Sequence, residues 1–439
     1  MAAAAADKAR FYLEQSVPEL QSYKEKGIFT PTEISAIAAK RSEFEHRINM
    51  AGAASPSDYA RYASYEQTLD TLRRMRCKRK AVKGTNFTGQ KRVFSILERA
   101  TKKFPGDLGL WMQYLEFCKQ ESANAKLAKA ITKVLRMHPT KCELWIWAAR
   151  HYFEAQGDMT TARSYMQRGL RFCQQERTLW TQYMKLEMIY VAKVAARRKI
   201  LKLDEDTEEI QDDHDMDADE IVLPGVTAEE LEPQKDRTLS IDDATLKKLA
   251  DAPALSGAIP MAIADAAAKA FQADAIVLES LFDTVLEFVD VPCQDAVLRH
   301  ILGLIPEGGK TSLIQSTMDA KLEVAGIDPS SAAFPPALGR VILCMKSLSA
   351  SSSEQRIFKH QRMIMFLAPF RSRNIDLDSD VEKVLLSTCK QHAKALQAIA
   401  DGKSSYRTNP MHELEKILLQ RGIKRKILVD LGIVGENPG

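Results

Sequence analysis

The chain of 439 residues lacks long hydrophobic runs. A transmembrane helix needs about 20 consecutive apolar residues, and no stretch reaches that length. The opening "MAAAAADKARF" has no basic segment followed by a long apolar one, so it does not predict a secretory signal. We therefore expect no membrane-spanning helix and no membrane partner.

Cysteine is also scarce. The seven cysteines are scattered and never form a CxxC pair, which is typical of free thiols in a reducing compartment rather than of a disulfide framework. The eight histidines form no HExxH, and Cys and His do not share metal-ligand spacing. The sequence predicts no metal site.

Catalytic motifs are missing as well. No GxSxG is present. The stretch "PEGGKTSL", residues 306–313, resembles a phosphate-binding loop, but the motif needs a glycine where Leu304 stands, and no strand pattern precedes it. We expect neither an enzyme nor a bound cofactor.

Tryptophan occurs only four times, yet three of its occurrences belong to one repeated phrase. The phrase reads "LWMQYLEFCKQ" at 110–120, "LWIWAARHYFE" at 144–154 and "LWTQYMKLEMI" at 179–189. Its tryptophans lie 34 and then 35 residues apart, a period that indicates a repeated supersecondary unit. Residues 55–203 are therefore predicted to form pairs of helices.

Aromatic residues at helical spacing inside such repeats usually pack in the core. Small or slender residues at Ala100, Val134 and Gly169 fall in the same register on the partner helices, where they let two helices approach closely. Trp147 lies off the register and is a candidate partner contact. The predicted repeat core contains Tyr62, Trp111, Tyr114, Trp145, Trp180 and Tyr183.

Residues 1–54 are predicted to form two docking helices. The second has a clear start, with Thr30 as cap, Pro31 in the first turn and Glu33 placed for a capping box. Ser55 is the predicted cap of the next helix.

The character of the chain changes after Leu203. Residues 204–243 are acidic and aperiodic, and are predicted to form a disordered linker. Helical patterns resume in 244–439, but no tryptophan follows Trp180. This C-terminal helical region is either a degenerate continuation of the repeats or a separate domain, and the predicted fold class is all-α.

The run "RRMRCKRKAVKGTNFTGQKR" carries the densest positive charge, with no acid between Asp70 and Glu98. It also lengthens the first repeat by about 18 residues, which predicts an inserted basic loop. Such a loop could bind RNA phosphates by releasing counterions, contact an acidic partner or serve as a nuclear localisation signal; the alternative is a solvated helix end. The candidate contacts are Arg73, Arg74, Arg76, Lys78, Arg79 and Lys80.

The phrase "LWxxYxxF" after an "ERAxxxFP" helix resembles the HAT repeat, because it lacks the Trp-x-x-Leu-Gly-x-x-Tyr of a TPR. The segment "VPELQSYKEKGIFTPTEISAIAAKRSEFEHRI", followed by "DYARYASYEQTLDTLRRMR", further resembles the opening of the U3 small nucleolar RNA-associated protein 6 family. The resemblance covers roughly residues 9–203. It implies a HAT/TPR-like helical-repeat solenoid.

The same resemblance implies a nucleolar, non-catalytic scaffold in the UTP-B module of the small-subunit processome, supporting 18S precursor rRNA processing and 40S subunit biogenesis. Its implied partners are WD-repeat propeller subunits, the U3 snoRNA particle and precursor ribosomal RNA. Two alternatives stay open. One is a HAT scaffold of pre-mRNA splicing or 3′-end processing, which would lack the "EKGIFTPTEISAI" opening. The other is a nuclear transport or chaperone adaptor, with which no RNA would co-purify.

Overall fold

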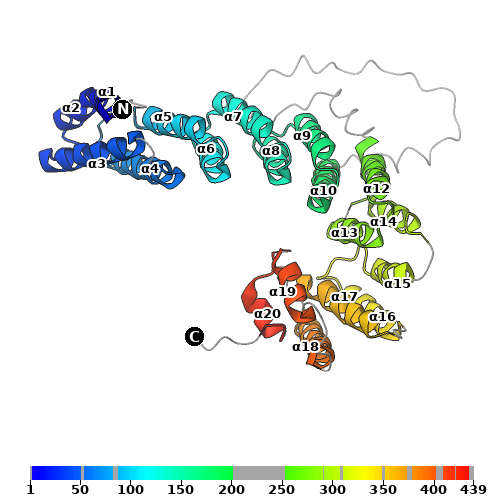
Figure 1. Cartoon of the computed structure of the whole chain (residues 1–439). Coiled ribbons are helices and arrows are strands. Elements are labelled where there is room, and N and C mark those ends of the chain that lie inside the picture. The colour runs from blue at the N-terminus through cyan, green and yellow to red at the C-terminus, as the bar shows by residue number, and fades with distance from the viewer. Residues whose placement is uncertain are drawn as a thin grey trace, which may run out of the picture. The chain divides into compact units, whose positions relative to one another are not determined.

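The computed structural model describes residues 2–50, 54–82, 88–200, 253–289, 291–306, 310–348, 352–372, 378–401, 409–420 and 422–434. Within these ranges all the regular elements are helices, which confirms the predicted all-α class (Figure 1). The predicted acidic linker, 204–243, lies outside the described residues. The chain divides into two compact units, Met1–Ala148 and Ala149–Gly439.

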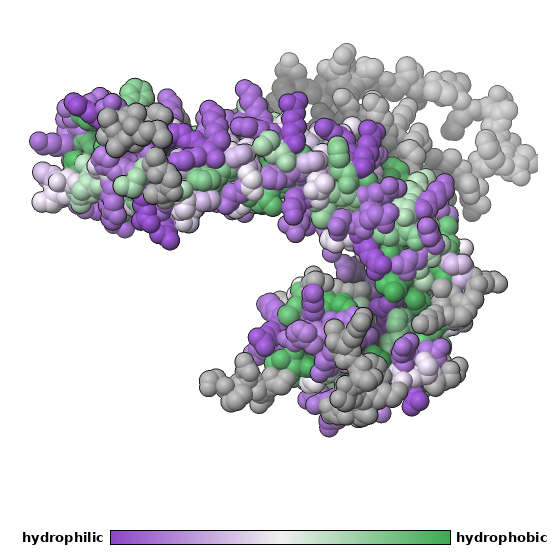
Figure 2. All heavy atoms as spheres, viewed as in Figure 1, coloured by the Kyte–Doolittle hydropathy of each residue, from purple (hydrophilic) through white to green (hydrophobic). Residues whose placement is uncertain are grey.

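The first unit is built from consecutive helices. The helices α1 and α2 pack on α3, and from α3 to α7 each helix packs against the next. Figure 2 shows mostly hydrophilic side chains on the visible outer face of these helices. The helices are α1 Ala2–Glu14, α2 Val17–Glu25, α3 Pro31–Asn49, α4 Pro56–Arg79, α5 Thr88–Lys103, α6 Leu108–Gln120, α7 Asn124–Met137 and the beginning of α8, Cys142–Ala155.

The N-terminal segment contains three helices, so the prediction of two was wrong. Pro18 explains the extra break, because a proline inside a continuous helix would lose a hydrogen bond and clash with the carbonyl of residue 14. In the structure it lies in the first turn of α2. The buried Ser16 precedes that turn, and its hydroxyl donates to the carbonyl of Leu13 at 2.6 Å.

The predicted helix starts are confirmed. Thr30 and Glu33 form a complete capping box at the start of α3. Ser55 caps α4, where Asp58 supplies the carboxylate that reaches back to the cap. Each box satisfies backbone N–H groups that a helix start otherwise leaves without partners.

The three tryptophans of the repeated phrase, Trp111, Trp145 and Trp180, each make the same kind of hydrogen bond. The indole N–H of each donates at 2.9 Å to the carbonyl six residues earlier, on Pro105, Pro139 or Gln174. The indole therefore ties the start of its helix to the preceding turn. The structure buries the whole predicted core: Tyr62, Trp111, Tyr114, Trp145, Trp180 and Tyr183.

The other expectations for the repeats have mixed outcomes. Ala100, Val134 and Gly169 are buried, as the close approach of helices requires. Trp147 is only half-buried in α8, so it is neither a core residue nor a fully exposed contact.

The basic run was predicted to be an inserted loop, and for its first half this prediction was wrong. Residues 73–79 continue α4, which is 24 residues long where α6 has 13. Arg, Lys and Met, which make up most of this stretch, are good helix formers, and no Gly or Pro interrupts the run before Gly84. The longer helix takes up much of the extra length of the first repeat.

The second unit joins the last repeat helices to the C-terminal region. After the end of α8 come α9 Met159–Phe172 and α10 Arg177–Ile200, and α10 packs on α9 and on α12 and α13. The remaining elements are the short 3₁₀ helix η1 Pro253–Ser256, α12 Ala258–Ala270, α13 Ala275–Leu286, α14 Gln294–Gly303, α15 Lys310–Leu322, α16 Phe334–Ser347, α17 Ser353–Ser372, α18 Ser379–Asp401, α19 Pro410–Gln420 and α20 Arg425–Asp430.

A buried charge cluster crosses the core of this unit. Lys321 of α15 is 3% exposed, and its Nζ lies 3.2 Å from Glu279 and 2.7 Å from Asp283, both on α13. Arg362 of α17 lies 2.8 Å from the other oxygen of Glu279. A lysine buried inside α15 obscures the apolar pattern of that helix, which the sequence patterns did not single out.

Two histidines meet between α17 and α18. The Nδ1 atoms of His360 and His392 lie 2.7 Å apart, and the buried Nε2 of His392 has no hydrogen-bond partner in the described part of the chain. Burial, with the nearby His360 and lysines, lowers the pKa of His392 to about 4. His392 is therefore held neutral at pH 7.

We expect the second unit to lose stability as the pH falls from 6.5 towards 4. The unfolded histidine, with its pKa near 6.5, binds a proton in this window while folded His392 does not, so the loss reaches up to about 3 kcal/mol. Urea unfolding at pH 7, 6 and 5 measures it, over a range in which carboxylates stay largely ionised. The variant His392→Leu should flatten the pH dependence and His412→Leu, at an exposed site, should not. An unchanged slope in His392→Leu would contradict the assignment.

Candidate functional site

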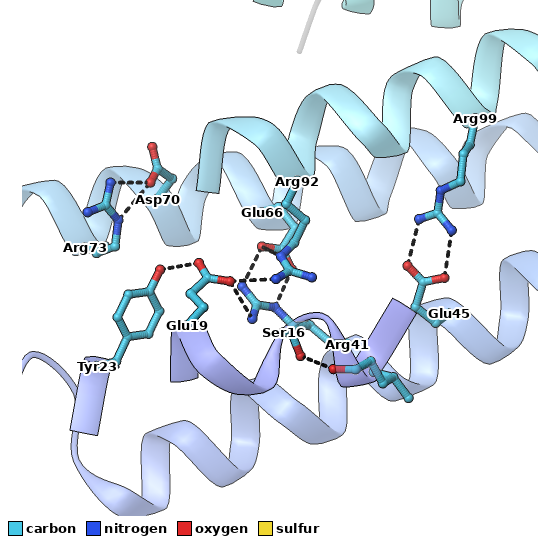
Figure 3. Close-up of polar contacts among 11 residues, drawn as sticks. Ser16, Glu19, Tyr23, Arg41, Glu45, Glu66, Asp70, Arg73, Arg92 and Arg99 are labelled. Atoms are coloured by element: carbon cyan, nitrogen blue, oxygen red, sulfur yellow. Dashed lines mark hydrogen bonds and ion pairs between the residues drawn. The ribbon is translucent and has the colours of Figure 1, made fainter. Parts of the chain in front are cut away.

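Buried ion pairs connect α2, α3, α4 and α5 of the first unit (Figure 3). Arg41 of α3 is 1% exposed and donates to both oxygens of Glu66 on α4, at 2.7 and 2.9 Å. Its third nitrogen lies 3.4 Å from Glu19 on α2. Arg92 of α5 donates to the same Glu19 at 2.6 Å. One cluster of charges thus holds four helices together.

The electrostatics keep this cluster ionised. Burial would raise the pKa of Glu19, but Arg41 and Arg92 beside it hold that pKa below its ordinary value. The hydroxyl of Tyr23 also donates to Glu19. Burial and the Glu19 charge raise the pKa of Tyr23, so its phenol remains protonated and keeps donating.

A second pair attaches α1. Arg99 of α5 donates to both oxygens of Glu45 on α3, at 3.0 and 2.7 Å. Its guanidinium stacks on the ring of Tyr12, on α1, with 3.9 Å between the guanidinium carbon and the ring centroid. The stack fixes Tyr12 over the pair and so positions α1 beside α5.

The first candidates of the basic run are already paired within the chain. Arg73 is buried and donates twice to Asp70, at 2.9 and 2.8 Å, so its guanidinium is not accessible to a partner. The prediction that Arg73 contacts RNA or an acidic partner is therefore wrong. Arg74 donates to Asp70 and to Glu121, each at 2.7 Å. Gly89 packs directly against Asp70, because a Cβ at this position would overlap the Asp70 carboxylate.

Arg76 is also engaged. It donates to both oxygens of Glu33 at 2.8 Å, and its guanidinium lies over the ring of Phe29. The hydrogen bond from Arg76 lowers the pKa of Glu33 to about 2. The capping carboxylate of α3 thus also anchors the end of α4.

The last three candidates, Lys78, Arg79 and Lys80, are exposed at the end of α4. Lys80 donates to the carbonyl of Gly27, in the turn between α2 and α3. Gly27 has a φ of 60°, which glycine adopts without strain, and it ends α2 there.

Lys24, in the last turn of α2, and Lys26, in the turn that follows, are both exposed, and sequence reasoning missed them. Their only signal in the sequence is their place at the end of a helix. The end of α4, which lies beside them, is far away along the chain, and the Lys80 to Gly27 contact spans 53 residues. Exposed Glu25 offsets one of these charges. We name Lys24, Lys26, Lys78, Arg79 and Lys80 the basic corner.

The described residues hold no group of three or more His, Cys, Asp or Glu side chains that could bind a metal ion. In the same residues, no helix combines the length and the apolar character needed to cross a membrane. Of the glycine-rich stretch 306–313, residues 307–309 are outside the description, and Lys310 opens a helix that follows another helix, α14.

Comparison with known proteins identifies the region that carries the ion pairs. A family model described as U3 small nucleolar RNA-associated protein 6 matches residues 13–99. The acids and arginines that pair around Glu19 and Glu45 lie within that range, and so does the pair of Asp70 and Arg73.

Similar proteins bear the same name. U3 small nucleolar RNA-associated protein 6 of Schizosaccharomyces pombe is 35% identical over 237 residues, which cover 51% of this chain and 48% of that protein. The Homo sapiens homolog is 29% identical over 195 residues, covering 43% and 32%. The Dictyostelium discoideum homolog is 26% identical over 207 residues, covering 46% and 34%.

The chain thus spans about half to a third of the length of the curated relatives it matches. The matched range includes the opening whose motifs carry the resemblance in the sequence, from Val17 through the capping box of α3 to the end of α4. Through this N-terminal region, the chain is similar to the U3 small nucleolar RNA-associated protein 6 family.

Proposed function

We propose that the chain is a non-catalytic scaffold of the UTP-B module of the small-subunit processome, in the nucleolus, supporting 18S precursor rRNA processing and 40S subunit biogenesis. The observation that carries this proposal is the family match over residues 13–99, a range in which buried ion pairs join the described helices. The relatives are named for their association with U3 small nucleolar RNA.

The mechanism proposed is binding alone. Helices packed one against the next present side chains of several neighbours on one surface, and such surfaces hold extended partners. The buried pairs of Arg41 and Arg99 fix α1, α3, α4 and α5 relative to one another, so little ordering entropy is lost when a partner docks. WD-repeat propeller subunits are the proposed protein partners.

The basic corner is the proposed contact for U3 snoRNA or precursor rRNA. Its exposed cations come from two helix ends that Lys80 joins through Gly27. Cations of this kind bind phosphates with little dependence on sequence and with a strong dependence on salt. Arg74 and Arg76 already have carboxylate partners, so they have less to offer to a phosphate.

A HAT scaffold of pre-mRNA splicing or 3′-end processing is the second candidate. It would share the tryptophan phrases and their indole hydrogen bonds. The family match over residues 13–99 favours the role in ribosomal RNA processing over this second candidate. The transport or chaperone adaptor gains no support from a specific observation.

The test purifies the tagged chain from nuclear extract, sequences the bound RNA and identifies the bound proteins. The proposal expects U3 snoRNA, precursor rRNA and WD-repeat proteins. Splicing or 3′-end components in their place would support the second candidate. Recovery of neither set would contradict both.

The basic corner has its own expected result. In the double variant Lys78→Glu with Arg79→Glu, affinity for a 20-nucleotide single-stranded RNA should fall about tenfold at low salt. The slope of log affinity against log salt should shrink by about 1.4, because two phosphate contacts are lost. Lys129→Glu with Arg136→Glu, two exposed cations on α7, is the matched control. Equal losses in both variants would assign the RNA contact to charge in general and not to the corner.

A further inference from the structure

Two hollows flank the stack of Tyr12 and Arg99 in the first unit. One, of about 580 Å³, is also lined by Phe11 of α1, Tyr59 of α4 and Lys102 of α5. The other, of about 260 Å³, is also lined by residues of α5 that include Lys91 and Ser95. Because both share Tyr12 and Arg99, they form one surface between the two helices, which we name the α1–α5 groove.

The groove has an exposed apolar side. Phe11 is 57% exposed, and its ring meets the edge of Tyr12 with 5.5 Å between centroids. Met50, 59% exposed, follows Asn49, which lines the first hollow. A large apolar side chain left in water beside a hollow is typical of a place where a partner's side chain docks.

The other side of the groove is cationic. Lys91 and Lys102 are exposed and have no carboxylate partner within the part of the chain that the structure describes. The buried acids that line the groove, Glu19 and Glu45, are already neutralised by arginines. Asp7 is the remaining acid, so the groove offers a net positive charge to a ligand.

The spacing of the two lysines sets the length of a ligand. They are 11 residues apart on one helix, about 16 Å at 1.5 Å per residue. An extended peptide covers that distance with about five residues. The Tyr12 and Arg99 stack lies between them, and Arg99 is already paired with Glu45.

We propose that the α1–α5 groove binds a short acidic peptide of a partner protein, in extended form. An apolar side chain of the peptide packs against Phe11 and Tyr12, and carboxylates on either side of it pair with Lys91 and Lys102. The exposed lysines of the groove lie at two places about 16 Å apart, with Lys91 at one end and Lys102 and Lys103 at the other. That arrangement is too sparse for successive phosphates of RNA, and the Asp7 carboxylate would repel them. The inference concerns a different surface from the basic corner and does not depend on the proposed function.

The test uses the full chain and three labelled probes: an acidic peptide of one-letter sequence DDLFEDD, its basic counterpart KKLFKKK and a 12-nucleotide poly(U). We expect fluorescence anisotropy to show binding of the acidic peptide in preference to the other two. The double variant Lys91→Glu with Lys102→Glu should weaken that binding at least tenfold, because each lysine becomes a repulsive charge. The variant Phe11→Ala should also weaken it, by about threefold to tenfold.

Matched controls distinguish binding in this groove from nonspecific electrostatic and nonspecific hydrophobic binding. Lys129→Glu with Arg136→Glu on α7 and Phe172→Ala on α9, where the phenylalanine is 56% exposed, should leave binding unchanged. Circular dichroism melting checks that each variant is folded. The proposal is overturned if the acidic peptide does not bind, if the groove variants bind it as the wild-type chain does, or if poly(U) is the probe that the lysine variant loses.

Discussion

Replacing Arg41 with methionine is expected to lower the free energy of unfolding of the first unit by about 3–5 kcal/mol. Methionine fills much of the same volume but leaves Glu66 buried without its two hydrogen bonds and removes one of the cations beside Glu19. Breaking a buried pair from one side costs more than the pair contributes, because the remaining charge has lost its solvent as well as its partner. Urea unfolding followed by circular dichroism measures the change.

Two further variants test this explanation. The double variant Arg41→Met with Glu66→Met removes both charges and should recover a large part of the loss. Arg10→Ala, which removes an exposed pair with Glu14 on α1, should give no measurable change. A loss below about 1 kcal/mol for Arg41→Met would mean that water reaches the cluster and that it does not stabilise the four helices as described.

Replacing Trp111 with alanine is expected to destabilise the first unit by about 3–5 kcal/mol. The residue is fully buried, so the truncation leaves a large cavity, and it also removes the indole hydrogen bond to Pro105. The variant Trp111→Phe keeps most of the ring and should cost less, about 1–2 kcal/mol for the lost hydrogen bond and volume. Trp147→Ala, at the half-buried tryptophan of α8, is the control and should cost less than Trp111→Ala. Similar losses at both positions would contradict the conclusion that Trp111, in the repeat register, is a core residue while Trp147, off that register, is not.

The parts of the fold that the sequence predicted are those set by local rules. The spacing of the tryptophans indicated the repeat, and the order of Thr30, Pro31 and Glu33 indicated the start of α3. Each depends on residues within one turn or one helix, so the pattern is visible in a short window. The break at Pro18 was equally local, and the information to predict it was present.

The candidate site was harder to predict because its partners are far apart in the sequence. Arg41 pairs with residues 22 and 25 positions away, and Arg99 with one 54 positions away. A run of positive charge gives no sign of which of its members face acids across the fold. Arg73 is buried against Asp70 while Lys78, five residues later, is exposed.

The order in which the buried pairs close has a consequence for synthesis of the chain. Glu19 and Glu45 leave the ribosome well before Arg92 and Arg99, which supply partners to both. A nascent chain that stops after α4 would have to bury these carboxylates with part of their cations missing, which is unfavourable. Its first helices therefore stay loosely packed until α5 has emerged, and holdase chaperones have that interval in which to bind them. A fragment meant to fold by itself must likewise extend through the end of α5, because the N-terminal helices acquire their last countercharges from it.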